Sequence, residues 1–127
     1  MSSAYYALFH ELARSCADLL IGGPGAKRSR PAWNQVYRAL EHGTAKNACL
    51  NGTVMPAFPR SIRNFADLFV QMQIKRHAAD YDPDAKPYKS AVLGDIAAVE
   101  TVLAGFRAAP VKHRQAFAAL VLFKIRP

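Results

Sequence analysis

The stretch that decides the fold is SSAYYALFHELARSCADLLI, residues 2–21. Its apolar side chains recur at three- and four-residue spacing, which places them on one face of a helix. That face consists of Tyr5, Leu8, Phe9, Leu12, Cys16, Leu19 and Leu20. The run Gly22-Gly23-Pro24-Gly25 follows directly and is typical of a helix end. We therefore expect an amphipathic helix over 2–21.

The same period continues along the chain. Pro31 can open a second helix at its first position and Gly43 can end it, and 44–50 can add a short turn or helix. Further helices are expected over 60–79, 92–106 and 111–123, separated by proline-containing breaks. No strand alternation or repeat is visible. The sequence predicts an all-α antiparallel bundle of four main helices plus a short connecting or C-terminal helix, in one domain over 1–127.

Basic residues outnumber acidic ones, and the 127-residue chain carries a formal net charge of +8. Such an imbalance favours an anionic partner such as nucleic acid, with a merely basic surface as the alternative. Lys27, Arg28 and Arg30 lie in the loop 22–30, where they can touch backbone phosphates or simply face solvent. This loop lacks the spacing of a nucleotide-binding P-loop and follows a helix, so we exclude nucleotide triphosphate hydrolysis.

No apolar run approaches the ~20 residues that cross a bilayer. The first 20 residues lack a basic leader and carry Glu11, Arg14 and Asp18, which argues against a signal peptide. We therefore expect a cytoplasmic protein without a membrane partner. The four histidines and two cysteines show no metal-ligand spacing, so no metal or other cofactor is expected. His42 is expected near the C-terminus of the second helix, where its charge suits the helix dipole.

The densest polar cluster is RHAADYD, residues 76–82. Arg76 can clamp a phosphate, and His77 or Tyr81 can assist proton transfer. The alternative is structural, because Arg76 and Asp80 are four residues apart and can pair on the helix surface.

Two segments resemble the HEPN superfamily. SAYYALFH, residues 3–10, is similar to the "AYYA-x-FH" helix of that family, and RHAADYDP, residues 76–83, is similar to its "R-x-x-ADYD" helix end. They occur in the family's order, about 70 residues apart. The resemblance implies an all-α bundle that dimerises, often acts as a metal-independent toxin ribonuclease, and is often paired with a nucleotidyltransferase antitoxin.

The family's active motif is Arg-x4–6-His, and this chain departs from it. Arg76 aligns with the motif arginine, but Tyr81 stands where the histidine is expected, and His77 follows the arginine directly. The family normally has a helix before the "AYYA" segment, and we expect this domain to be without it, because Met1 stands almost at the motif. We expect a HEPN-like domain that binds RNA or a nucleotide through Arg76, Lys27, Arg28 and Arg30. The alternatives are a protein-interaction module without nucleic-acid function, and an active ribonuclease that uses Arg76 with His77 or Tyr81.

Overall fold

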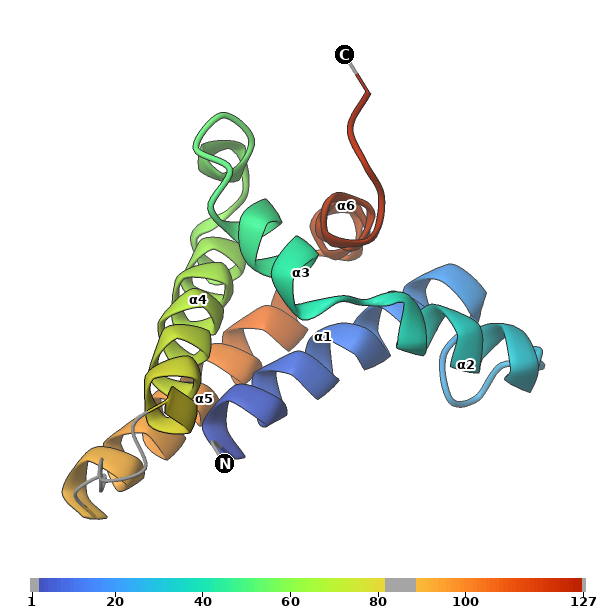
Figure 1. Ribbon diagram of the computed structural model, residues 1–127. Coiled ribbons are helices and arrows are strands. Elements are labelled where there is room, and N and C mark those ends of the chain that lie inside the picture. The colour runs from blue at the N-terminus through green and yellow to red at the C-terminus, as the bar shows by residue number, and fades with distance from the viewer. Residues whose placement is uncertain (1–2, 82–88, 127) are drawn as a thin grey trace.

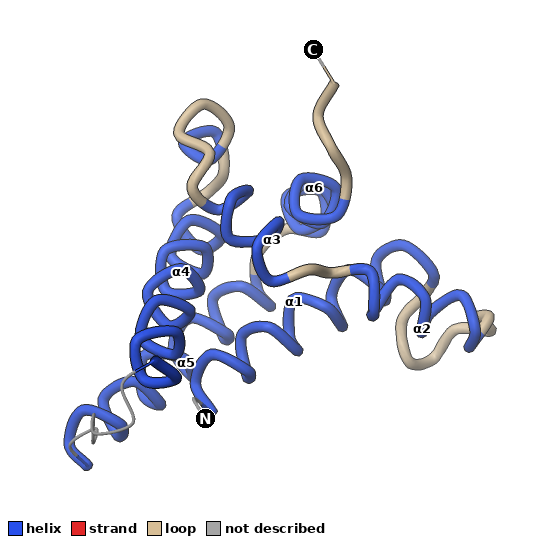
Figure 2. The backbone as a smooth tube through the Cα atoms, in the orientation of Figure 1, coloured by secondary structure: helices blue, strands red, loops and turns tan. Residues whose placement is uncertain are grey.

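The computed structural model describes residues 3–81 and 89–126, and these residues form helices and loops without any strand (Figure 2). The all-α prediction is therefore confirmed for the described part of the chain. In order, the elements are α1 (Ser3–Ile21), α2 (Arg30–Ala39), α3 (His42–Cys49), the 3-10 turn η1 (Met55–Ala57), α4 (Arg60–Tyr81), α5 (Lys89–Ala108) and α6 (Val111–Leu122).

The three longest helices form the centre of the molecule. Figure 1 shows α4 and α5 running antiparallel, with α1 beside them, and α1 packs on both. The shorter helices cover what this trio leaves open: α6 packs on α1 and α3, α3 packs on α4, and α2 packs on α1. The described residues thus contain two short helices, α3 and α6, beside the four that were expected to be the main ones.

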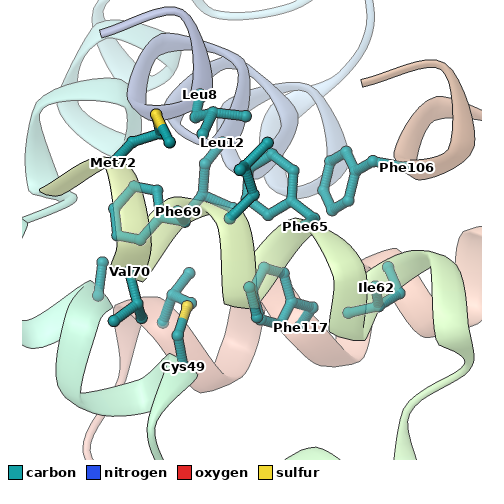
Figure 3. Packing of buried hydrophobic residues seen from close by; sticks show 14 of the residues in the cluster. Leu8, Leu12, Cys49, Ile62, Phe65, Phe69, Val70, Met72, Phe106 and Phe117 are labelled. Atoms are coloured by element: carbon teal, nitrogen blue, oxygen red, sulfur yellow. The ribbon is translucent and has the colours of Figure 1, made fainter. Parts of the chain in front are cut away.

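Phenylalanines from three helices make the core (Figure 3). Phe65 and Phe69 come from α4, Phe106 from α5 and Phe117 from α6, and all four are fully buried. Phe65 stacks on Phe106 with ring centroids 4.3 Å apart, and Phe117 meets both rings edge-on. Burying an aromatic side chain of this size stabilises the fold by roughly 1.5–3 kcal/mol, so this cluster dominates the cohesion of α4, α5 and α6.

Glycine and proline set the boundaries around α2. Gly22 follows the last residue of α1 and has a φ of +140°, a backbone conformation that residues other than glycine rarely adopt. Ser29 then caps α2 by accepting a hydrogen bond from the backbone N–H of Ala32, and Pro31 lies in the first turn as expected.

The expected end of the second helix at Gly43 is wrong. The helix ends at Ala39, because Leu40 and Glu41 adopt extended backbone conformations that carry Leu40 into the core. His42 is consequently the first residue of α3 and Gly43 lies inside that helix. The charge of His42 therefore does not sit at the C-terminus of α2. A protonated imidazole would instead meet the positive end of the α3 dipole.

Among the described residues, no helix combines the length and the apolar character that crossing a bilayer requires.

Candidate nucleic-acid interface

Four rings from α1 and α2 stack in a row on the surface of the molecule. Trp33 and Tyr37 have centroids 5.2 Å apart and planes 22° apart. Tyr37 continues onto His10 at 6.2 Å and 11°, and His10 continues onto Tyr6 at 5.9 Å and 26°. We call these four residues, Trp33, Tyr37, His10 and Tyr6, the aromatic ladder.

Helix geometry explains why the ladder forms. Tyr6 and His10 are four residues apart on α1, and Trp33 and Tyr37 are four apart on α2, so each pair shares one helix face. A hydrogen bond of 2.7 Å between His10 Nδ1 and the Tyr37 hydroxyl joins the two pairs. α2 has no fully buried residue, so its rings hold it to α1 while they remain partly open to water.

An arginine lies over each end of the ladder. The Arg28 guanidinium carbon is 4.8 Å from the Trp33 ring centroid, and that of Arg76 is 4.9 Å from the Tyr6 centroid. Both distances suit a cation–π contact. The α1 positions next to these ends, residues 6 and 18, are separated by about 18 Å at 1.5 Å per residue. The ladder is therefore an extended strip with a guanidinium group at both ends.

Arg28 is fixed by polar contacts as well as by the ring. Its Nη1 donates to a carboxylate oxygen of Asp18 at 2.9 Å and to the carbonyl of Gly22 at 2.9 Å. The indole N–H of Trp33 donates to the same Asp18 oxygen at 2.9 Å. Asp18 thus positions the arginine and the tryptophan together at this end of the ladder.

At the other end, Arg76 reaches from α4 across the start of α1. Its guanidinium carbon lies 5.4 Å from the Tyr5 ring centroid as well as close to Tyr6, and its Nε is 3.7 Å from a carboxylate oxygen of Asp80. The ion pair with Asp80 that the spacing suggested is therefore present. A partly exposed pair of this kind contributes only about 0.3–0.5 kcal/mol, which leaves the guanidinium available to a phosphate.

His42 lies beside the ladder in a more enclosed position. Its ring stacks on Phe9 with centroids 4.0 Å apart, and its Nδ1 is 2.5 Å from the Tyr5 hydroxyl. Burial lowers the pKa of His42, and the nearby positive charges of Arg76 and His10 lower it further. Burial also raises the pKa of Tyr5 to about 12. At neutral pH the phenol of Tyr5 therefore stays protonated, and the hydrogen bond joins it to a neutral His42.

Gln73 on α4 supports the same region. Its side-chain nitrogen donates to the backbone carbonyl of His42 at 3.3 Å. Its side-chain oxygen is buried, and no hydrogen-bond partner lies within the described residues.

The site residues expected from the sequence separate into two groups. Arg76 and Arg28 contact the ladder, whereas Lys27, in the loop before α2, and Arg30, the first residue of α2, are exposed. The ring of His77 packs on that of Tyr81 at 4.5 Å, and within the described chain neither ring stacks on a ladder ring. Both are exposed, Tyr81 by 77%. Asp82 and Pro83, the end of the second family-like segment, lie outside the described residues.

Sequence reasoning missed most of the ladder and His42. The signal was present, because Tyr6/His10 and Trp33/Tyr37 are pairs of flat, polar-tipped rings at helical spacing. That spacing also suits a buried stripe, so it does not by itself identify a surface site.

In the ranges 3–81 and 89–126, no three His, Cys, Asp or Glu side chains gather closely enough to hold a metal ion. No protein-family model matches the chain, and neither a curated protein nor a solved structure matches it significantly.

Proposed function

We propose that this protein binds single-stranded RNA along the aromatic ladder. The observation that carries the proposal is the ladder itself: four partly exposed, stacked rings with a guanidinium over each end. Proteins that bind single strands combine aromatic surfaces for bases with positive charge for the backbone. The net charge of +8 favours the same class of ligand.

HEPN membership is part of the proposal, and one contact supports it. The two family-like segments, residues 3–10 and 76–83, are far apart in sequence. Arg76 of the second segment nevertheless lies over Tyr5 and Tyr6 of the first. A functional arginine held against the "AYYA" helix gives both segments a role in one site.

The proposal includes two partners that the resemblance implies. They are a second copy of the chain and a nucleotidyltransferase-type antitoxin. Val92, Leu93 and Ile96 on α5 are exposed apolar side chains, and such patches favour self-association. Light scattering at micromolar concentration tests the dimer directly. A monomer mass would remove that part of the proposal and leave the ladder unaffected.

The binding experiment uses a fluorescently labelled, unstructured RNA oligonucleotide at low salt, followed by anisotropy. Arg76→Ala and Trp33→Ala should weaken binding because they remove a charge and a stacking surface from opposite ends of the ladder. Tyr81→Ala is the matched control, because it removes an exposed ring from the same helix as Arg76. Absence of binding by the wild-type protein, or an equal loss with Tyr81→Ala, would refute the proposal and favour an interaction module.

RNA cleavage is the second candidate, and a specific arrangement favours it. His10 and His42 both contact Phe9 and Tyr6, and each places its Nδ1 on a tyrosine hydroxyl, which directs Nε2 elsewhere. In the tautomer whose Nδ1–H donates to the Tyr5 hydroxyl, a neutral His42 can accept at Nε2 the proton of a 2′-hydroxyl that attacks the adjacent phosphate. A protonated His10 can return a proton to the departing 5′-oxygen, while Arg76 neutralises the phosphate charge.

Analysis of the RNA products distinguishes cleavage from binding alone. Incubation of total RNA and tRNA with the protein, without divalent metal, should yield fragments that end in cyclic phosphate. His10→Ala and His42→Ala should abolish them, and His77→Ala should have no effect. Binding without fragments would leave the ladder as a binding site only.

A further inference from the structure

A buried carboxylate on α1 lies close to the ladder but plays no part in it. Glu11 is only 8% exposed, and its two oxygens accept hydrogen bonds from Arg107 Nε at 2.8 Å and Arg107 Nη2 at 3.1 Å. Arg14, one turn along α1, donates to it as well. An unpaired buried charge costs several kcal/mol, so these two arginines are needed to keep Glu11 ionised. Burial by itself raises the pKa of Glu11, and the bonds and charges of both arginines more than offset this, so the pKa lies below its ordinary value.

The arginines that hold Glu11 are themselves open to water. The side chains of Arg14 and Arg107 are 50% and 55% exposed. Arg107 uses Nε and Nη2 for Glu11, and Arg14 uses Nη2. A guanidinium has five N–H donors, so each keeps donors that point away from the carboxylate. Glu11 therefore orients two guanidinium groups and leaves some of their N–H donors for other partners.

A third arginine completes the wall of a pocket. Arg114, in the first turn of α6, is oriented by a hydrogen bond from its Nε to the carbonyl of Ala109 at 2.9 Å, which leaves its two terminal nitrogens for other partners. Glu11, Arg14, Ser15, Arg107 and Arg114 all line a cavity of about 290 Å³. This volume is near the lower end for ligand sites and suits a small group.

The charge around the cavity indicates the class of ligand. Among the described residues that line the cavity, three arginines accompany two acids, Glu11 and Asp18, and Asp18 is paired with Arg28. Two positive charges are left over. A phosphate monoester carries close to two negative charges at neutral pH, whereas a backbone phosphodiester carries one. Arginine forks also match the oxygen geometry of phosphate.

We propose that this pocket binds a phosphate monoester dianion, held by Arg14, Arg107 and Arg114, with Glu11 as the positioning residue. Two sources can supply this chemistry, a small phosphorylated molecule or the 5′-terminal phosphate of an RNA. The second source rests on the proposed function, because the pocket also includes Asp18, which positions Trp33 at one end of the ladder. The first source does not.

The test is titration of the full chain with inorganic phosphate by calorimetry, at low salt and at pH 6 and pH 8. Binding should be tighter at pH 8, where phosphate is the dianion. Arg14→Lys keeps the charge but removes the fork, and Arg114→Ala removes a donor from another helix. Both should weaken binding at least tenfold. Arg126→Ala, an exposed arginine beyond α6, is the charge-matched control and should change nothing.

Two further measurements complete the design. Thermal melts should show Arg14→Lys and Arg114→Ala folded, and a change of melting temperature on adding phosphate should be lost in both. Oligonucleotides with and without a 5′-phosphate then separate the sources. A preference for the phosphorylated end assigns the pocket to RNA, and equal affinity assigns it to a small molecule. Absence of phosphate binding at millimolar concentration, or an equal loss with Arg126→Ala, would overturn the proposal even if RNA still binds the ladder.

Discussion

Two sets of stacked rings in this molecule have similar geometry and opposite surroundings. Phe65 and Phe106 stack in the core at 4.3 Å and 28°, and Trp33 and Tyr37 stack on the surface at 5.2 Å and 22°. The core rings are fully buried and carry no polar atom, whereas the ladder rings are partly exposed and carry N–H, hydroxyl or imidazole groups. Stacking distance alone therefore does not separate a structural cluster from a binding surface. Exposure and polar tips are what distinguish the ladder, which we propose as a binding surface, from the core.

The largest expected effect breaks the core. Phe65→Ala should lower the free energy of unfolding by about 3–5 kcal/mol, because it leaves a cavity among rings that cannot close around it. Chemical denaturation measures this loss. RNA affinity of the remaining folded protein should be unchanged, and a specific loss of affinity would mean that the two clusters are not independent.

The matching change in the ladder should lower RNA affinity and have little effect on stability. Trp33→Ala should weaken RNA binding by about 1–3 kcal/mol, the cost of losing one base-stacking surface. Its melting temperature should fall much less than that of Phe65→Ala, because no residue of α2 is fully buried. Anisotropy and thermal melts on the same samples provide the comparison. If Trp33→Ala were as unstable as Phe65→Ala, the ladder would be a structural cluster like the core and not a binding surface.

The response to pH sharpens the contrast further, because the ladder region contains a shifted histidine and the phenylalanine core contains no titratable group. The pKa of His42 is lower when folded than when unfolded. Below about pH 6.5, His42 therefore binds a proton more readily in the unfolded chain than in the folded one. The stability that a neutral His42 contributes is lost as the pH falls from about 6.5 through the lower pKa of the folded state. His42→Gln should flatten the melting temperature between pH 7 and pH 5. An unchanged slope would show that His42 is not the group responsible.

The smallest expected effect concerns charge at the end of the ladder. Arg28→Ala should lower the salt slope of RNA binding by about 0.7, the value for one contact on a single strand. Lys27→Ala, its neighbour without a ladder contact, should leave the slope unchanged. Measurement of affinity at four salt concentrations distinguishes the two variants. Equal slopes would indicate diffuse charge rather than a defined contact.

The sequence by itself determined the helices and most of their limits. Apolar period, Gly22 and Pro31 are local signals, and they predicted α1, the start of α2, α4, α5 and α6 correctly because backbone conformation depends mainly on near neighbours. Arg76 was likewise predicted as a candidate site residue from its own segment, and its pair with Asp80, which helical spacing suggested, is present in the structure.

Only the tertiary structure decided which helix faces are covered. The same three- and four-residue spacing of apolar residues includes the buried Phe65 and the partly exposed Tyr37. Periodicity shows which residues share a helix face, but it does not show which element packs on that face. The contact between Arg107 and Glu11 joins residues 96 positions apart, and that between Tyr5 and His42 joins residues 37 apart. Such pairs depend on how whole helices are placed against each other. The ladder and the arginine pocket therefore emerge only when α1, α2, α4, α5 and α6 are assembled.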